Sequence, residues 1–391
     1  MKVRAGLALL AVAGLAAIAV AVAAAATDSG RGTVSASATS AASCKKPTIG
    51  MSAPITGPAG SIGSDQLHWA QYYVARWNKL HPKFKVTLKQ FDDQIDAAKA
   101  VTGAQQFASD SSVLAVIGPA GSNQVIAAAP VYKRGGLAFI SGSATKVSLT
   151  DGSNAGYFFR VVPNDNFQGP KDAKYAMSHL GVKSGDHVMI VDDSEAYATG
   201  LRDVTKPVLE AAGVKVDTES IAQTDTDFTS IVNKTANDKV VFLYFQLASQ
   251  AQTFAQQMKE KGRTAIVFGS DGTFDSATFN VNGSYVSFFA PDVTQLKSSA
   301  GLVNGFYAKY GRSTTPFGAP NYVVAQLEIN AIQKACKDGK VSRTEVRKLI
   351  AKTNLKTTVL GVPIKFTKNG DVTGANDYIF KIENGKYVQV G

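Results

Sequence analysis

Apolar stretches of strand length alternate with amphipathic stretches of helix length along most of the chain. The strand-like runs are apolar at nearly every position, which is typical of strands whose two faces are both covered in a parallel sheet. The predicted strands are residues 47–52, 84–91, 113–118, 137–141, 187–192, 215–221, 240–245 and 265–269. The predicted helices between them are residues 65–79, 96–109, 123–133, 167–180, 198–212 and 249–261. Repeated β-α-β units predict an α/β fold built of doubly wound parallel sheets.

The alternation runs twice, once over residues 45–160 and again over 165–290, and the chain passes between the two sets near 157–163. Further helices are predicted at 295–310, 321–337 and 342–352, and the C-terminal end has the pattern of short strands joined by turns. Neither end segment has enough strands to form a domain alone. We therefore expect each to complete one of two α/β domains, which agrees with a length of 391 residues.

The first 26 residues have the pattern of a secretory signal peptide. Lys2 and Arg4 precede an uncharged apolar run that ends in small residues, Ala24 to Ala26. The alternative is a retained membrane anchor, which the abundance of alanine disfavours because alanine contributes little to insertion. Residues 27–43 are rich in Gly, Ser, Thr and Ala and predict a flexible leader. The protein is thus expected outside the cytoplasmic membrane, in the periplasm or at the cell surface.

The composition limits the classes of function. The formal charge of +11 falls to +9 without Lys2 and Arg4, and the remaining basic residues are scattered, with no basic run interleaved with aromatics. This pattern argues against a nucleic-acid-binding protein. The two cysteines, Cys44 and Cys336, are too few for a disulfide scaffold. Export favours a disulfide between them, and two buried free thiols are the alternative. Cys44 follows a polar stretch, which argues against a lipoprotein.

Motifs of catalysis and cofactor binding are missing from the sequence. It contains no GxSxG nucleophile elbow and no GxxxxGK[ST] phosphate loop, and Gly57, Gly60 and Gly63 do not have dinucleotide-binding spacing. The four histidines are far apart, so no histidine-rich metal centre is predicted. Paired aspartates such as Asp92–Asp93 are typical of turns and helix caps. We expect a protein without enzymatic activity, metal or cofactor.

Four polar loops follow predicted strands, at residues 116–123, 139–145, 192–197 and 268–272. In open α/β sheets, ligands bind beyond the carboxyl ends of the strands. Ser122 is placed at the N-cap or first turn of a helix, where its hydroxyl and free N–H groups suit a carboxylate. Ordinary capping and turn chemistry is the alternative for any one loop. Together the four predict a polar site for a small zwitterion.

The order of several short motifs resembles the extracytoplasmic solute-binding proteins of ABC importers, the type that binds leucine, isoleucine and valine. Each motif is weak alone, but their order and spacing over about residues 45–390 are specific. The motifs are IGMSAPITGP at 49–58, FDD at 91–93, VIGP at 116–119, ISGSAT at 140–145, FR at 159–160, YATGL at 197–201, GVPIKF at 361–366 and NGD at 369–371.

This resemblance implies the type I periplasmic binding protein fold, in which two lobes are joined by three crossings and the ligand lies between them. The crossings are expected near residues 160–163, 289–292 and 356–361. The first lobe would comprise 44–161 and 291–356, and the second 162–290 and 357–391. Cys44 and Cys336 would then share a lobe, which makes their pairing easier.

The resemblance also assigns roles in ligand binding. Ser122 corresponds to the family serine that contacts the ligand carboxylate. Ser143, Ala144 and Thr145 correspond to the loop whose backbone and hydroxyl groups bind the carboxylate and the ammonium.

In the second lobe, Tyr197 corresponds to a tyrosine of the cleft. Asp271 stands where the leucine binder has a glutamate for the α-ammonium group. Ile62 and Leu247 stand at or near positions that are aromatic in the family, so a reshaped side-chain pocket is expected.

The predicted function is therefore capture of a small polar solute and its delivery to an ABC permease by a monomer that closes about a hinge. An amino acid is the foremost candidate for the solute, and amides, urea-like solutes and aromatic acids are the alternatives. One alternative is a sensor of the same fold that regulates a partner. Another is an exported hydrolase, for which the predicted cleft loops contain no histidine.

Overall fold

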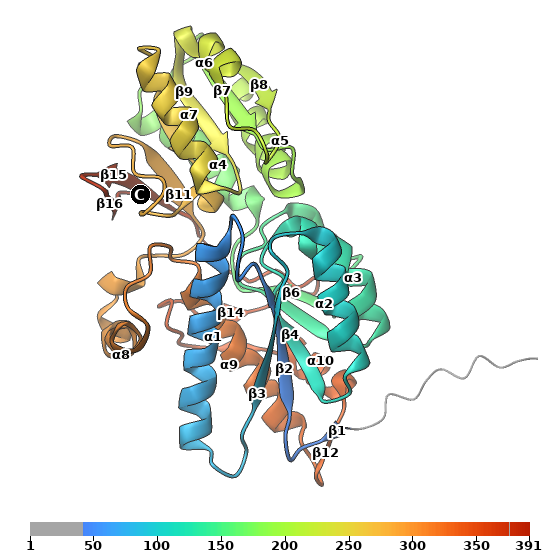
Figure 1. Ribbon diagram of the computed structural model, residues 1–391. Helices are drawn as coiled ribbons and strands as arrows, with labels where there is room; N and C mark the ends of the chain where they lie inside the picture. Colours follow the sequence, from blue (N-terminus) through green and yellow to red (C-terminus); the bar gives the residue numbers. More distant parts are fainter. Residues whose placement is uncertain (1–41, 375) are drawn as a thin grey trace, which may run out of the picture. The chain divides into compact units, whose positions relative to one another are not determined.

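The computed structural model describes residues 42–374 and 376–391, and its first sheet has five parallel strands (Figure 1). Their order is β3-β2-β4-β5-β6. The strands are β2 (Thr48–Ala53), β3 (Thr87–Asp92), β4 (Val113–Ile117), β5 (Ala138–Ser141) and β6 (Phe158–Arg160). Both faces are covered, so polar side chains reach solvent or a binding site mainly at the strand ends.

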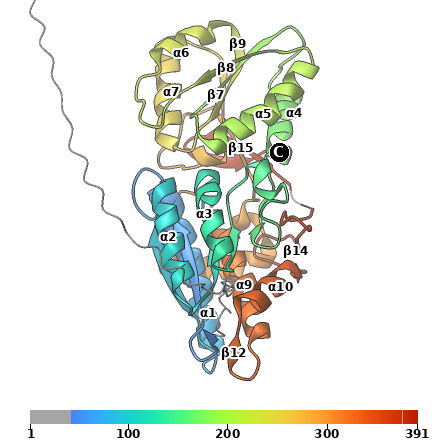
Figure 2. The ribbon, with the colours of Figure 1, turned by 90° about the vertical axis from the view of Figure 1, so that its right-hand side faces the viewer.

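Helices from the two ends of the chain cover this sheet (Figure 2). On one face, Tyr132 packs against Phe139 of β5 and Phe107 belongs to the same cluster, and on the other the helices contribute Trp69 and Tyr322. The covering helices are α1 (Gly60–Leu80), α2 (Ala97–Ser109), α3 (Ser122–Arg134), α9 (Gly318–Ala335) and α10 (Arg343–Ala351). The segment after residue 290 therefore returns to the first sheet through α9 and α10.

The second sheet has seven strands in the order β16-β15-β11-β10-β9-β7-β8; β15 pairs antiparallel with both β11 and β16, and the other neighbours are parallel. The strands are β7 (His187–Asp192), β8 (Lys215–Ser220), β9 (Asp238–Tyr244), β10 (Ile266–Gly269), β11 (Tyr285–Phe288), β15 (Tyr378–Glu383) and β16 (Lys386–Gln389). Its helices are α4 (Asp165–His179), α5 (Ala196–Ala211), α6 (Thr229–Lys234) and α7 (Ala248–Glu260).

Strand β7 shows why a continuous apolar run forms here. Val188 and Ile190 point into the core that contains Leu201 of α5, whereas Met189 and Val191 join the core on the opposite face. Because successive side chains of a strand point to opposite faces, a strand between two helical layers needs apolar residues at every position. The sequence pattern and the two-sided packing therefore agree.

The parallel strands of both sheets have the same order, with the second strand of each set outside the first. The strand order reverses between β2 and β4 in the first sheet and between β7 and β9 in the second. Ligands of open α/β sheets bind at such reversal points. The two sheets and their helices form one compact unit, and the predicted α/β, doubly wound fold in two lobes is confirmed. We call the part around the first sheet the first lobe and the other the second lobe.

Several element boundaries differ from the predicted ones. Helix α1 begins at Gly60 rather than Asp65, because Gly63 lets the helix pass against the backbone of Pro54, where a side chain would collide. Residues 295–299 are not α-helical, since short 3₁₀ turns at Val293–Gln295 and Lys297–Ser299 precede α8 (Ala300–Tyr310). The hydroxyl of Ser299 donates to the carbonyl of Val359 at 2.7 Å and so holds this irregular segment.

The predicted disulfide between Cys44 and Cys336 is present, with the two Cα atoms 5.9 Å apart. It fixes the start of the described chain to the end of α9. The predicted leader is wrong in its last two residues, because strand β1 (Ala42–Ser43) pairs with β12 (Lys340–Val341). The predicted signal peptide at 1–26 and the leader up to residue 41 lie outside the described residues.

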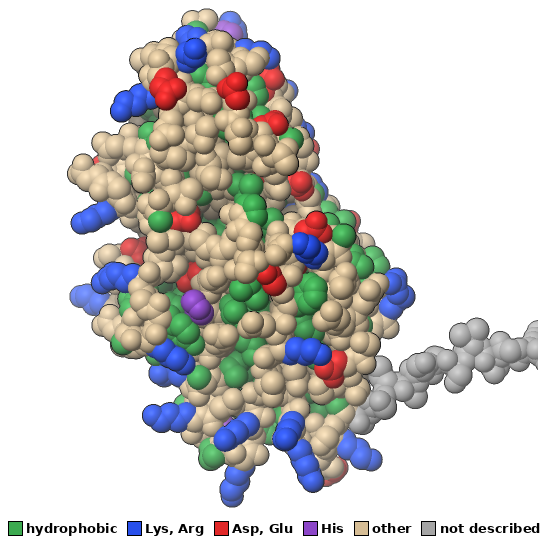
Figure 3. Space-filling view, in the orientation of Figure 1, with side chains coloured by type: hydrophobic (Ala, Val, Ile, Leu, Met, Phe, Trp, Pro, Cys, Tyr) green, Lys and Arg blue, Asp and Glu red, His purple; other side chains and the backbone are tan. Residues whose placement is uncertain are grey.

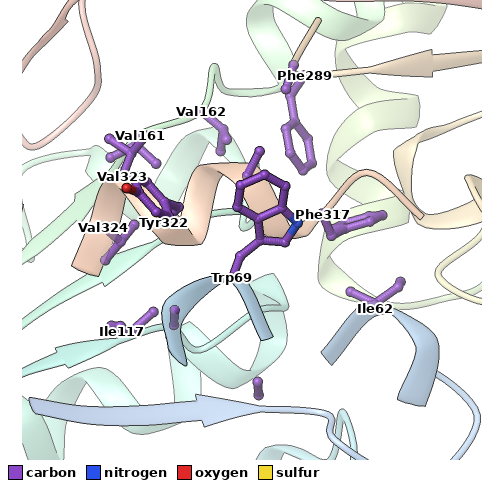
Figure 4. Close-up of a cluster of buried hydrophobic side chains, with 14 of the residues drawn as sticks. Ile62, Trp69, Ile117, Val161, Val162, Phe289, Phe317, Tyr322, Val323 and Val324 are labelled. Carbon is purple, nitrogen blue, oxygen red and sulfur yellow. The ribbon is translucent and has the colours of Figure 1, made fainter. Parts of the chain in front are cut away.

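The chain passes between the lobes beside a shared apolar cluster (Figure 4). Val161 and Val162 after β6 and Phe289 after β11 belong to the same buried cluster as Trp69 of α1. The third connection follows the hairpin of β13 (Asn354–Leu355) and β14 (Ile364–Lys365). Gly370 still accepts a hydrogen bond from the backbone of Arg160 in β6, at 3.0 Å. These contacts place the third crossing later than the predicted 356–361.

Basic side chains are dispersed on the face shown in Figure 3. Arg343 is buried and donates to backbone carbonyl groups, among them those of Val113 at 2.9 Å and Gly135 at 2.8 Å. The guanidinium group of Arg343 therefore binds backbone carbonyl groups inside the first lobe and does not contribute to a basic surface patch. Within the described residues, no helix is long and apolar enough to cross a membrane.

Candidate functional site

The loops at the strand-order reversals of both sheets surround a small cavity of about 30 Å³. Of the predicted site residues, Ser122, Ser143 and Tyr197 line it; Ala144, Thr145 and Asp271 do not. The remaining lining residues are Ile62, Ile95, Ala120, Gly121, Gln246, Gly272 and Phe317. The cavity thus combines hydroxyl groups with an apolar wall.

Ser122 is the first residue of α3, and the N-cap is Gly121. No side chain caps this helix, so the first-turn N–H groups keep their capacity to donate toward the cavity. Such an N-terminus attracts a carboxylate through these donors and through the positive end of the helix dipole. Ser122 is buried, and its hydroxyl oxygen accepts a long 3.3 Å hydrogen bond from the backbone of Lys146, its one partner within the described part of the chain.

The loop after β5 is fixed by its own hydroxyl groups. The Ser141 hydroxyl donates to the carbonyl of Pro119 at 2.7 Å and accepts from the backbone N–H of Ala144 at 2.9 Å. The Ser143 hydroxyl donates to the carbonyl of Ala120 and accepts from the side chain of Gln66, both at 2.8 Å. These two serines therefore tie the loops after β4 and β5 together, and the N–H of Ala144 is already used.

Arg160 fixes the same loop from beneath. This fully buried guanidinium donates to the carbonyls of Ala144 at 3.2 Å and Lys146 at 2.8 Å, to the hydroxyl of Thr150, and to Asp371 at 2.7 Å. A guanidinium suits this place because its fork of donors can serve several acceptors at once. Arg160 therefore links the loop after β5 to Asp371, in the chain near the third crossing.

Asp271, at the end of β10, is buried beneath Tyr197 and next to Gly272 of the cavity wall. Its Oδ1 atom accepts from the Tyr197 hydroxyl at 2.5 Å and from the Gln168 amide at 2.7 Å. No hydrogen bond to Oδ2 arises from the described part of the chain. Burial raises the pKa of Asp271 to about 6, against the lowering effect of both hydrogen bonds. The group is thus mostly ionised at pH 7, with one oxygen left for a cation.

Further carboxyl groups lie buried behind Asp271. Asp172 accepts from the Ser287 hydroxyl at 3.1 Å and from Tyr244 at 3.3 Å, and burial holds its pKa well above the usual range. Burial raises the pKa of Asp165 to about 7, although the nearby Thr145 hydroxyl lowers it. Asp165 and Asp271 each raise the pKa of Asp172, so the carboxyls are close enough to feel one another's charge.

Two first-lobe side chains bind the first turn of α5 in the second lobe. The Asn123 side-chain oxygen accepts from the backbone N–H of Ala196 at 2.7 Å, and the Lys146 ammonium donates to the carbonyl of the same residue at 2.9 Å. Gly200 one turn later leaves room for the Lys146 side chain, because a methyl group there would lie 3.0 Å from its nitrogen. These contacts join the lobes beside the candidate site.

A second, outer cavity of about 420 Å³ adjoins the first and shares Ile62, Gln246 and Gly272 with it. Its first-lobe wall is the loop 57–62, and its second-lobe wall includes Ser249, Asp275 and Thr278. A cavity of about 330 Å³ between α9 and residues 357–361 contains none of the predicted site residues. The inner and outer cavities together form the candidate site.

Sequence reasoning missed three lining residues. Phe317 precedes α9, far along the chain, and Figure 4 shows it on the side of Trp69 that faces Ile62. Ile95 lies in the loop after β3, and Gln246 follows β9 directly, next to the predicted position Leu247. Because Gln246 follows a strand directly, the rule that ligands bind beyond the carboxyl ends of strands could have predicted it, as it predicted Ser122. Leu247 itself packs into the core.

Among the residues that the structure describes, no group of three or more His, Cys, Asp or Glu side chains is placed to hold a metal ion.

Comparison with known proteins gives relatives and solved structures of similar sequence and fold. A Leu/Ile/Val-binding protein of Rhizobium johnstonii, BraC3, is 26% identical over 360 residues, which cover 87% of this chain and 93% of that protein. A homologue of Leu/Ile/Val-binding proteins from Brucella melitensis is 24% identical over 87% of this chain and 92% of its own. Among solved structures, the LivJ substrate-binding protein of Streptococcus pneumoniae in complex with isoleucine superposes with a TM-score of 0.79 at 24% identity, over 88% of this chain and 99% of LivJ. The family model described as periplasmic binding protein matches residues 46–386, and the chain therefore belongs to the periplasmic binding protein family.

Proposed function

We propose that this protein is an exported substrate-binding protein that captures an amino acid between its lobes and delivers it to an ABC permease. The observation that carries the proposal is the opposite character of the two sides of the site. The uncapped N-terminus of α3 with Ser122 offers donors for a carboxylate, and the buried Asp271 offers an acceptor for an ammonium group. An α-amino acid presents both groups on one carbon.

Tyr197 and Gln168 support this role of Asp271. Both donate to Oδ1, which orients the carboxylate and leaves Oδ2 for the ligand. Ser143 contributes by fixing the loop after β5, and Ala144 and Thr145 lie in that loop. Because Ser143 and Ala144 already hold hydrogen bonds within the first lobe, we assign the carboxylate chiefly to Ser122 and the first turn of α3.

Lobe closure supplies the mechanism. The first lobe would hold the carboxylate, and Asp271 and Tyr197 would complete the site when the lobes meet, as the contacts of Asn123 and Lys146 with α5 allow. We assign residues 44–161 and 291–370 to the first lobe and 162–290 and 371–391 to the second, which moves the third crossing from the predicted 356–361 toward residue 371. The named relatives suggest amino acids as the ligand class and an ABC importer as the partner.

Isothermal titration calorimetry of the purified exported protein against the common amino acids tests this proposal. We expect at least one amino acid to bind the natural protein, and Asp271→Ala to weaken that binding by about a hundredfold or more, since a charge-assisted bond in a dry site is lost. Asp203→Ala is the matched control, because Asp203 is an exposed aspartate on α5. Equal binding to the natural protein and to Asp271→Ala would refute the assignment of the ammonium group.

A further inference from the structure

Gln246 stands at the border between the inner and the outer cavity, and its side-chain amide is held in one orientation. The Gln246 Oε1 atom accepts from the Gln223 amide nitrogen at 3.1 Å, and that nitrogen also lies 3.4 Å from Asp193 Oδ2. Burial raises the pKa of Asp193 to about 6, so at pH 7 its carboxylate mostly accepts rather than donates. The nitrogen of Gln223 must therefore face Asp193, which directs the oxygen of Gln246 toward Gln223 and its nitrogen away.

The free end of Gln246 is consequently a hydrogen-bond donor at the site. A methyl group placed on Gly121 would lie 2.8 Å from Nε2 of Gln246, so this nitrogen lies against the first-lobe loop that carries Ser122. Within residues 42–374 and 376–391, Nε2 itself donates no hydrogen bond. The backbone N–H of Gln246 donates to Asp193 at 2.7 Å, which fixes the residue further.

The outer cavity contains one carboxylate acceptor, beside the hydroxyl groups of Ser61, Ser249 and Thr278. Asp275 lines it, and its two oxygens accept from the backbone of Ala277 at 3.1 Å and from the Thr278 hydroxyl at 3.2 Å. A carboxylate has about four lone-pair sites, so Asp275 can accept a further hydrogen bond. Ile62 is the one large aliphatic side chain among the residues that line this cavity.

The lining disfavours three kinds of ligand side chain. A branched aliphatic side chain would leave Gln246 Nε2 unpaired when the lobes meet, and a buried unpaired polar group is costly. A carboxylate would face the charge of Asp275. A cation would leave the Gln246 donor unpaired, and it would approach the positive ends of α1 and α7, whose first residues line the cavity without side-chain caps.

We propose that the outer cavity is the side-chain subsite and selects an amino acid whose side chain ends in a primary carboxamide. The amide carbonyl accepts from Gln246 Nε2, and the amide NH₂ group donates to Asp275. This inference rests on the proposed function, because it takes the α-carboxylate and α-ammonium groups to be bound in the inner cavity. Gln246 and Asp275 are then the residues that determine specificity.

Calorimetric titration of glutamine, asparagine, glutamate, lysine and leucine against the natural protein and single variants tests the proposal. We expect glutamine or asparagine to bind at least tenfold more tightly than leucine. Gln246→Met keeps the length of the side chain without the donor and should lower carboxamide affinity about tenfold or more, leaving leucine affinity unchanged or higher. Gln256→Met, an exposed glutamine of α7, is the matched control.

A second variant gives a readout that structural damage would not produce. Asp275→Asn removes the repulsion of an acidic ligand, so glutamate affinity should rise relative to glutamine affinity. Leucine binding as tight as that of both carboxamides, or an equal loss of leucine and carboxamide binding in Gln246→Met, would overturn the inference and leave the proposed function standing. If no amino acid binds the folded natural protein, the proposed function fails, and this inference fails with it.

Discussion

The buried carboxyl group of Asp271 should make ligand affinity and protein stability respond to pH in opposite directions. Burial raises its pKa to about 6, and the hydrogen bonds from Tyr197 and Gln168 offset only part of that effect. The perturbation is a change from pH 7 to pH 5, in which a free amino acid keeps its ammonium group protonated and its carboxylate ionised. Asp271 is therefore the partner that changes charge.

The magnitude for binding follows from the fraction of ionised Asp271. An ammonium group binds the ionised form, so below a pKa of about 6 the affinity falls about tenfold for each pH unit. Between pH 7 and pH 5 this amounts to a loss of about tenfold. If the ligand is not an ammonium ion, or if Asp271 does not contact it, this loss does not occur.

The magnitude for stability has the opposite sign. The pKa of Asp271 is higher in the folded protein than its ordinary value of 3.8, so the folded state binds the proton more tightly than the unfolded chain does. The resulting stability is fully present below about pH 4 and is lost as pH rises through about 6. A shift of this size corresponds to roughly 3 kcal/mol. Asp165 and Asp172 shift in the same direction and add to the trend.

Calorimetric titration and thermal unfolding without ligand, both at pH 7, 6 and 5, measure the two effects. Asp271→Asn should bind weakly at every pH with a flatter pH profile, and without ligand it should unfold at a higher temperature than the natural protein at pH 7. Asp203→Asn should behave as the natural protein does. Equal affinity of the natural protein at pH 7 and pH 5 would refute the reasoning.

Three further predictions concern the framework of the site. Lys146→Met and Asn123→Ala each remove one lobe-to-lobe hydrogen bond to α5, and each should weaken amino-acid binding about two- to tenfold in calorimetry; unchanged affinity in both would contradict a role in closure. Reduction of the Cys44–Cys336 disulfide opens a link across 292 residues and should lower stability by up to about 5 kcal/mol in the chain-entropy model, which thermal unfolding with and without reductant will measure; identical midpoints would contradict it. Arg160→Lys should cost about 3 kcal/mol or more in urea unfolding, because lysine cannot serve the separate acceptors of the guanidinium; a stability equal to that of the natural protein would contradict it.

The fold was largely predictable because its sheets are buried on both faces. The run at β7 is apolar at successive positions, and no amphipathic helix has that pattern. Boundaries were less predictable where tertiary contacts set them. Helix α1 starts among glycines that a hydropathy pattern assigns to a loop, and β6 is a short edge strand that appeared as part of a connection.

The candidate site was predictable in position and less so in its contacts. Ser122 and Tyr197 follow strands of different sheets, and the rule that loops at carboxyl ends converge was enough to bring them together. The same rule cannot say that the Ser143 hydroxyl is used within the first lobe, because that depends on the orientation of Gln66 in α1. Phe317 lies at the cavity because the segment after residue 290 returns to the first lobe, and sequence order alone does not show how close this segment comes to the cavity.

Helix α4 shows why such information is missing from a pattern. Asp165, Gln168 and Asp172 lie on one face of the helix, since residues three and four apart are neighbours there, and hydropathy assigns a face of this kind to solvent. The structure buries all three and leaves Phe167 about half exposed, at 46%. Gln168 donates to both Asp271 and Ser287, and Ser287 donates to Asp172. This buried polar face of α4 therefore connects Asp271, the carboxylate that we assign to the ligand's ammonium group, to a buried hydrogen-bond network. Burial of these carboxyl and amide groups lowers the stability of the protein. The same burial raises the pKa of Asp271, the residue that we assign to the ligand's ammonium group.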